Sequence, residues 1–255
     1  MVELGRSLVT PVLQHGVSRV AVVVYGELGR AGTVARHLEE AFWASDVEVA
    51  AVLAADGARW VSLVPETSDP REYDPWTHPF VAEAVVRGQV VLPSRHAVRS
   101  LLDVDPGLEA EVAAHRRSVG RGDGEVGDET PATTVRRTME RHLTARALPT
   151  AREVAALLDA VADQEGRDAA WAWVARQDAR VHVDLWLRVV RGCPPQDRAA
   201  CAAVLAFHAW LAGDGALAWC AVDASQQAAG DCSLTRLVED LLTRAAPPTM
   251  WAPLA

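Results

Sequence analysis

The hydrophobic pattern of this chain changes once, and the change falls at a stretch that has no pattern. Residues 118–131 read Ser-Val-Gly-Arg-Gly-Asp-Gly-Glu-Val-Gly-Asp-Glu-Thr-Pro, a glycine-rich run of mixed charge. This composition predicts a flexible linker, because it offers no regularly spaced apolar side chains to bury. Before this stretch short apolar runs alternate with helical spacing, whereas every later segment has helical spacing alone. The sequence therefore predicts an α/β N-terminal domain, a small mixed sheet with helices, followed by an all-α helical domain.

We place the α/β domain at residues 1–107, a flexible linker region at 108–132 and the helical domain at 133–255. Asp56-Gly57 is a strong hairpin signal between two of the expected strands. The strands expected in the first domain are residues 20–25, 47–54, 58–64 and 89–92. The helices expected there are residues 2–16, 33–44, 80–87 and, capped by Ser94, 95–102. The helices expected in the second domain are residues 133–147, 150–164, 169–177, 183–190, 198–212, 216–229 and 233–244.

Charge and composition exclude several classes of protein. The formal net charge of −9 argues against a nucleic-acid partner, because affinity for phosphate backbones needs a basic surface. The sequence contains no lysine, so all 25 of its Lys and Arg positions are arginine. Without lysine there is no pyridoxal Schiff base, no Walker-A lysine and no protein-kinase lysine. We therefore expect none of these enzyme classes, and no cofactor.

We expect a cytoplasmic protein with no membrane partner. The N-terminus lacks a basic segment followed by an apolar one, and the longest apolar runs are too short to span a bilayer. The four cysteines, Cys193, Cys201, Cys220 and Cys232, never form a Cys-x-x-Cys pair. Small buried hydrophobes are the expected role of such cysteines in a cytosolic chain. Cys201 and His208 lie two helical turns apart, but the spacing is wrong for zinc, so no metal site is predicted.

Two further patterns are weighed against simpler explanations. Gly26-x-x-Gly29-x-x-Gly32 follows a strand and precedes a helix, where a dinucleotide fingerprint would lie. Its spacing departs from Gly-x-Gly-x-x-Gly, and Glu27 places a carboxylate where a phosphate would bind, so we favour a tight strand-to-helix turn. The many tryptophans are interpreted as core and inter-helix packing rather than an aromatic cage. No Gly-x-Ser-x-Gly elbow is present, and no familiar catalytic spacing was found.

A tetratricopeptide-like helix pair is predicted near residues 199–230. Leu205-Ala206, Gly213-Asp214, Ala218 and Ser225 stand at offsets that resemble such a pair. The small residues would let two antiparallel helices approach closely, and we expect Ala206 and Ala218 to face each other. Ala209 replaces the usual aromatic residue and Gly230 the usual proline, so we predict one helical layer and no long array.

Taken together, several motifs resemble an actinobacterial family known only as domain of unknown function 4192. The motifs that carry the resemblance are Val23-Val-Tyr-Gly26, Asp56-Gly-Ala-Arg-Trp60-Val-Ser62, Ala82-Glu-Ala84, Gly88-Gln-Val-Val-Leu-Pro-Ser-Arg95, Leu205-Ala-Phe-His-Ala-Trp-Leu-Ala-Gly-Asp-Gly-Ala-Leu-Ala218, Ser233-Leu-Thr-Arg-Leu237 and Pro247-Pro248. The resemblance covers nearly the whole chain and implies no activity. Family members usually begin with a strand hairpin, whereas this chain opens at the following helix. Many also carry a cysteine cluster in the loop corresponding to residues 65–79, which here has no cysteine.

The leading functional hypothesis is a non-enzymatic protein-interaction or scaffold protein with an unidentified protein partner. The helix pair and the lack of a catalytic constellation support it. If the leading hairpin is missing, an unblunted sheet edge at the N-terminus would favour self-association. The alternative is a protein or enzyme that binds a small anionic metabolite at the strand-end loops of the α/β domain.

The alternative hypothesis places a ligand beyond the carboxyl ends of the strands, as in other open α/β sheets. If the strands run parallel, their end loops share one edge of the sheet. Two arginines and a helix N-terminus would then favour an anion there, with two carboxylates as counter-charges. A purely structural pairing of these charges is the simpler explanation. The predicted ligand-binding residues are Gly26, Glu27, Asp56, Arg59, Ser94 and Arg95.

Overall fold

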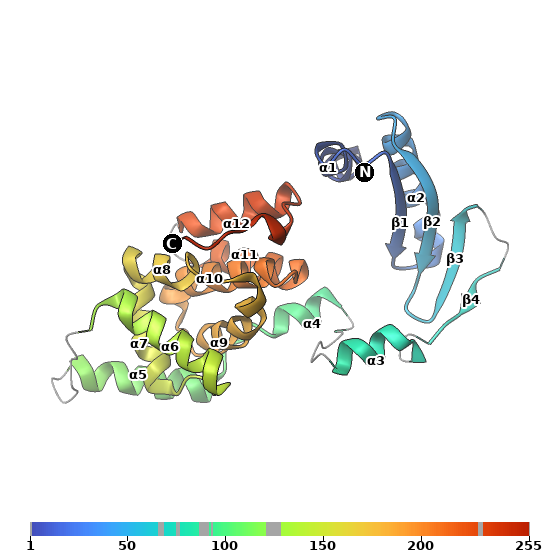
Figure 1. Ribbon diagram of the computed structural model, residues 1–255. Helices are drawn as coiled ribbons and strands as arrows, with labels where there is room; N and C mark the ends of the chain where they lie inside the picture. Colours follow the sequence, from blue (N-terminus) through green and yellow to red (C-terminus); the bar gives the residue numbers. More distant parts are fainter. Residues whose placement is uncertain are drawn as a thin grey trace. The chain divides into compact units, whose positions relative to one another are not determined.

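The computed structural model confirms the predicted fold class, a small mixed sheet followed by a mostly helical region (Figure 1). It describes residues 2–65, 69–74, 77–86, 92, 94–120, 129–228 and 232–254. The chain divides into two compact units, Met1–Val91 and Leu92–Ala255, which we call the α/β unit and the helical unit. Each has its own hydrophobic core.

The α/β unit is built on a four-stranded sheet. Its strands are β1 (Arg19–Tyr25), β2 (Glu48–Ala55), β3 (Arg59–Val64) and β4 (Arg71–Glu72), in the spatial order β1-β2-β3-β4. Strands β1 and β2 pair in parallel, whereas β3 pairs antiparallel with both β2 and β4. The hairpin predicted from Asp56-Gly57 joins β2 to β3, where Gly57 has a φ of 95°. The two-residue β4 lies within the segment predicted as a loop over 65–79.

Helices cover one face of this sheet. Helix α2 (Leu28–Trp43) connects β1 to β2 and packs on both strands, and α1 (Val2–Gln14) packs on α2. The core between them contains the buried side chains of Val9, Leu38 and Phe42. Helix α2 begins at Leu28 rather than Thr33, so two glycines expected in the turn are helical. A further helix, α3 (Pro79–Val86), ends the described part of this unit. In the strand predicted over 89–92, residues 89–91 lie outside the described part of the chain.

Six of the seven helices predicted from Thr133 onward are present with shifted ends, whereas the helix predicted over 169–177 is replaced by one over Gln164–Trp171 and a 3-10 turn over Arg176–Asp178. The helical unit contains a succession of short α-helices. They are α4 (Arg95–Ser100), α5 (Pro106–Gly120), α6 (Pro131–Ala145), α7 (Ala151–Ala162), α8 (Gln164–Trp171), α9 (Ala179–Arg191), α10 (Arg198–Leu211), α11 (Gly215–Gln227) and α12 (Ser233–Thr243). The 3-10 turns η2, η3 and η4 cover Arg176–Asp178, Pro195–Asp197 and Pro248–Met250. Within the described residues, no helix has both the length and the apolar character needed to cross a membrane.

Helix α10 lies at the centre of the helical unit. Every side chain from Cys201 to Leu211 is buried, and α8, α9, α11 and α12 pack around it. A helix that is apolar on all sides must be surrounded, because no face of it is suited to water. Its sequence Arg-Ala-Ala-Cys-Ala-Ala-Val-Leu-Ala-Phe-His-Ala-Trp-Leu is rich in alanine, so neighbouring helices can approach closely.

The turn between α10 and α11 has the geometry that its sequence predicts. Gly213 adopts a φ of 82°, and the amide of Asp214 donates to the Ala209 carbonyl at 2.8 Å, which closes α10 in a Schellman motif. The Asp214 carboxylate then caps α11 by accepting from the Leu217 amide at 3.0 Å. Ser225, near the end of α11, donates to the carbonyl of Ala199 at 2.7 Å, so the two helices run antiparallel in close contact.

Two outcomes qualify the sequence analysis of this region. Ala206 and Ala218 are both fully buried in the α10–α11 pair, whose tetratricopeptide-like character stays a prediction. The predicted linker region, 108–132, needs a correction, because residues up to Gly120 belong to α5. The side chains of Leu108 and Val112 are buried in the core of the helical unit, which fixes this helix. Residues 121–128 of the predicted linker lie outside the described part of the chain, as does Ala229, the last residue of the helix predicted over 216–229.

Helix α8 turns back tightly against the end of α7. Asp163 ends α7 and caps α8, its carboxylate accepting from the Glu165 amide at 2.7 Å. A Cβ atom built on Gly166 would lie 2.0 Å from the carbonyl oxygen of Ala160. Only glycine fits at this position without moving the backbone, so the two helices depend on it for their contact.

The substitution Gly166→Ala should therefore destabilise the helical unit, because overpacking of this kind costs about 1–3 kcal/mol or more. Gly215→Ala is the matched control, since nothing lies within 4 Å of its added Cβ and alanine is the better helix former. Thermal unfolding followed by circular dichroism should show a lower midpoint for the first variant only. Equal midpoints would contradict the close approach of α7 and α8.

A pair of buried histidines crosses the core beside α10. The rings of His182 on α9 and His208 on α10 have centroids 5.4 Å apart, and neither side chain is exposed. The Nε2 atom of His208 lies 2.9 Å from the Ala170 carbonyl. Burial, and then the neighbouring side chains of His142 and Arg146, lowers the pKa of His182 to about 4. Burial, and then His182, lowers the pKa of His208 to about 3. Both rings are therefore neutral near pH 7.

These two histidines should make the protein acid-sensitive. The unfolded chain takes up a proton at each position near pH 6.5, before the folded chain does, so stability falls as pH falls from 6.5 towards 4. Each histidine contributes up to about 1.4 kcal/mol per pH unit in this range. Urea unfolding between pH 7 and pH 4.5 should show a shallower dependence for His208→Leu. The variant His96→Gln, at an exposed position, should keep the wild-type dependence of unfolding free energy on pH. A shallower dependence in His96→Gln but not in His208→Leu would contradict the assignment of acid sensitivity to the buried histidines.

Candidate functional site

Four of the residues predicted to bind a ligand lie in the α/β unit, at the carboxyl ends of β1 and β2. Gly26 and Glu27 follow β1, and Asp56 and Arg59 flank the turn that follows β2. Because β1 and β2 are parallel, these loops share one edge of the sheet, as the sequence analysis required. The amide of Gly26 donates to the carbonyl of Ala55 at 2.9 Å, which ties the two loops together.

The charges at this edge pair with one another. The Arg59 guanidinium bonds the Asp56 carboxylate at 3.0 Å, and the same carboxylate accepts from the amides of Arg59 at 2.7 Å and Ala58 at 3.0 Å. The two backbone amides, and then the Arg59 side chain, lower the pKa of Asp56. Glu27 lies 3.5 Å from Arg30 within the first turn of α2. These contacts support a structural role in holding the turns.

The other two predicted residues belong to the helical unit. The Ser94 hydroxyl caps α4 as predicted, accepting from the Ala97 amide at 3.1 Å. Arg95 forms an ion pair with Asp223 of α11 at 3.1 Å. Both predicted arginines thus have a carboxylate partner inside their own unit. A single anion site formed by all six predicted residues stays a prediction.

A different place in the helical unit brings cationic side chains together around a cavity of about 350 Å³. The cavity lies between the start of α5, the end of α6 and one face of α9. The lining residues are Asp105, Leu108, His142, Arg146, Leu148, Val181, Asp184, Leu187, Arg188 and Arg191. Three guanidinium groups face two carboxylates there, so the cavity favours a negatively charged ligand.

Helix α9 supplies half of this lining through one stripe of its surface. Asp184, Arg188 and Arg191 follow one another at intervals of four and three residues, so they lie on the same face. The opposite face is buried and apolar, with Leu185 and Val189 in the core. Burial of that face fixes the rotation of the helix. It therefore directs the charged stripe towards the cavity.

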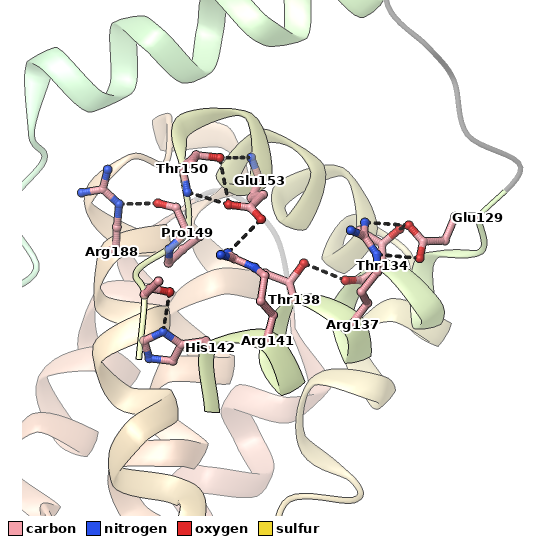
Figure 2. Close-up of polar contacts among 11 residues, drawn as sticks. Glu129, Thr134, Arg137, Thr138, Arg141, His142, Pro149, Thr150, Glu153 and Arg188 are labelled. Carbon is pink, nitrogen blue, oxygen red and sulfur yellow. Dashed lines mark hydrogen bonds and ion pairs between the residues drawn. The ribbon is translucent and has the colours of Figure 1, made fainter. Parts of the chain in front are cut away.

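The segment that joins α6 to α7, residues 146–150, forms the rim of the cavity and is held by polar contacts at both ends (Figure 2). Arg188 donates through Nε to the carbonyl of Pro149 at 2.6 Å. Thr150 and Glu153 form a capping box at the start of α7, and Glu153 also pairs with Arg141 at 2.8 Å. Thus α9 and both flanking helices fix the rim.

Arg146 turns the chain at this rim. It ends α6 with a left-handed φ of 55°, and its amide donates to the carbonyl of His142 at 2.9 Å. Its exposed side chain has no ion-pair or hydrogen-bond partner among the described residues, and the same holds for Asp184. Figure 2 shows that only the Nε edge of Arg188 is used by Pro149. The cavity therefore presents cationic groups that can still bind an acceptor.

The third arginine of the cavity already has an ion-pair partner within the protein. Arg191 lies 3.6 Å from Asp105, with both side chains well exposed, so the ion pair is weak. The amide of Asp105 donates to the Arg191 carbonyl at 2.8 Å, and its carboxylate accepts from the Gly107 and Leu108 amides. Asp105 thus caps α5 and joins it to the end of α9. This contact builds one wall of the cavity.

The chemistry of this site is recognition by charge and shape. Leu108, Leu148 and Leu187 add an apolar surface beside the guanidinium groups. In the described part of the chain, no three His, Cys, Asp or Glu side chains gather in a group that could hold a metal ion. The sequence analysis missed this cavity. The spacing of Asp184, Arg188 and Arg191 was a readable signal, but their approach to Arg146 is a tertiary contact that no local pattern contains.

Comparison with known proteins gives one match. The model of a protein family described as domain of unknown function (DUF4192) matches residues 1–249. No curated protein and no solved structure matches the chain.

Proposed function

We propose that this chain, which belongs to the DUF4192 family, is a binding protein whose helical unit holds a small anionic molecule in the arginine-lined cavity. The observation that supports this most is the convergence of Arg146, Arg188 and Arg191, from two separate segments, on one cavity of about 350 Å³. This volume falls within the usual range for small-molecule sites. The ligand class, a small anion, is that of the alternative hypothesis from the sequence. The proposed site lies in the helical unit and not at the strand-end loops of the α/β unit.

The free donors define the kind of anion. Guanidinium groups bind carboxylate and phosphate through paired N–H donors, and Arg188 keeps its terminal nitrogens unbonded among the described residues. Asp184 and Asp105 at the same cavity would repel a ligand that is negative at both ends. The fit is therefore best for a molecule with one anionic end and an apolar or cationic remainder.

A protein-interaction role is the second candidate, and a different observation favours it. Tyr25, Trp43 and Phe80 in the α/β unit are 78%, 82% and 74% exposed. Large aromatic side chains are enriched at protein interfaces, where their burial contributes much of the binding energy. The two candidates use different units of the chain, so one protein can serve both roles.

The anion proposal is tested by calorimetry at low ionic strength with inorganic phosphate, sulfate, acetate and citrate as probes. Binding should raise the thermal midpoint with probe concentration, because a ligand specific to the folded state stabilises it. Arg146→Asn keeps a residue that tolerates the left-handed conformation while removing the charge, and should weaken binding about tenfold or more.

Arg117→Gln is the matched control, since it removes an exposed arginine of α5 that does not line the cavity. It should bind the probes as the wild type does. If Arg146→Asn and Arg117→Gln weakened binding equally, the change in net charge alone would explain the loss. That result would contradict a specific site.

A further inference from the structure

His142 has an unusual pair of hydrogen-bond partners at the wall of the cavity. The side chain is only 3% exposed. Its Nδ1 atom lies 2.8 Å from the carbonyl oxygen of Ala147, and its Nε2 atom lies 3.0 Å from the carbonyl oxygen of Val181. Both distances are those of hydrogen bonds, and both partners are oxygens that can only accept.

Only one protonation form of the ring satisfies both partners. Neutral imidazole carries a single N–H, so one ring nitrogen would direct a lone pair at a carbonyl lone pair. The neutral ring therefore makes only one of the two hydrogen bonds, and its second nitrogen is held with its lone pair against a carbonyl oxygen. The imidazolium form carries an N–H on each nitrogen and donates to Ala147 and Val181 together. The arrangement of these three residues is therefore complementary to a protonated His142.

We propose that the cavity binds its anion together with a proton, which is held on His142 between the carbonyls of Ala147 and Val181. The inference rests on the proposed anion-binding function and adds its coupling to pH. The ligand class becomes the anion of an acid, taken up with one proton. Uptake of the proton from solvent forms one N–H bond on the ring, and this adds the second N–H···O contact to the one that the neutral ring already makes.

The position of His142 explains why the proton and the anion affect each other. Ala147 belongs to the rim segment that carries Arg146, and Val181 belongs to α9, which carries Arg188. A doubly donating ring joins the rim to α9 and so holds the two arginines on opposite walls of the cavity. Loss of the proton releases one of these two contacts. The binding geometry of the cavity then depends on the charge of a residue that need not touch the ligand.

The charges that face this ring set the direction of the coupling. His182 of α9 lies nearby and is neutral near pH 7, while Glu153 of α7 pairs with Arg141, the residue that precedes His142 on α6. The remaining charged groups around the cavity are Asp105, Arg146, Asp184, Arg188 and Arg191. The arginines oppose a further positive charge at His142, and the carboxylates favour it. An anion in the cavity offsets the arginines, so anion and proton bind more tightly together than apart, by equal amounts.

The test is calorimetry of the full chain with sulfate, whose charge does not change between pH 5.5 and pH 8.5. Titrations in two buffers with different ionisation enthalpies count the protons taken up. We expect sulfate affinity to fall as pH rises, by up to about tenfold per pH unit, with an uptake that approaches one proton. Sulfate binding that is independent of pH and takes up no proton would overturn the inference and leave the proposed function standing. No binding of any probe at any pH would overturn both.

His142→Gln supplies the matched variant, because an amide donates to one carbonyl and takes up no proton. It should abolish the proton uptake and flatten the pH profile, whereas His96→Gln should keep both. Unchanged proton uptake in His142→Gln would place the proton elsewhere and contradict the proposal. Should this variant not fold, nitrogen NMR of the histidine rings in sulfate-saturated wild type decides the matter. Two protonated nitrogens on His142 are expected, and a neutral tautomer would overturn the inference.

Discussion

The burial of α10 on every side from Cys201 to Leu211 is the constraint on which the helical unit depends. A helix segment without a solvent face must have neighbours on every side, and here α7, α8, α9, α11 and α12 contact it. Alanines at positions such as Ala202, Ala206 and Ala209 keep those neighbours close, while Phe207 and Trp210 fill the spaces between them. Close packing of this kind leaves little freedom for any surrounding helix to rotate or slide. The orientation of each outer helix therefore follows from the surface of α10.

The cavity is an indirect result of that packing. Helix α9 presents Trp186 and Val190 to the core, so its opposite stripe must point outwards with Arg188. The rim segment then meets this stripe because His142 and Arg188 bond its backbone. Three cationic groups are thus brought together by contacts that are mostly apolar or main-chain. The packing of the helical unit offsets the charge repulsion among the three arginines, and a bound anion would reduce that repulsion.

Local sequence patterns predicted most of the helices and strands but few features of the arginine-lined cavity. The apolar run that became β1, the turn at Gly57 and the cap at Ser94 each depend on a few neighbouring residues, so the sequence reveals them. The end of the helix predicted over 150–164 was close to the break at Asp163, but the next helix begins at Gln164 and not at residue 169, and only the close approach at Gly166 shows the chain turning back there. The partner of Arg95 was not predicted, because Asp223 lies 128 residues away in the sequence. The cavity was not predicted for the same reason, because its lining residues come from segments far apart in the sequence.

The rim segment is anchored almost entirely through main-chain atoms. His142 bonds the carbonyl of Ala147 and Arg188 bonds that of Pro149, and every amino acid carries a carbonyl. Positions 147 to 149 can therefore exchange side chains without losing these anchors. Leu148, half exposed and facing the cavity, is the residue most free to vary. A change of this one side chain would therefore alter the apolar lining of the cavity while the backbone of the rim stays in place.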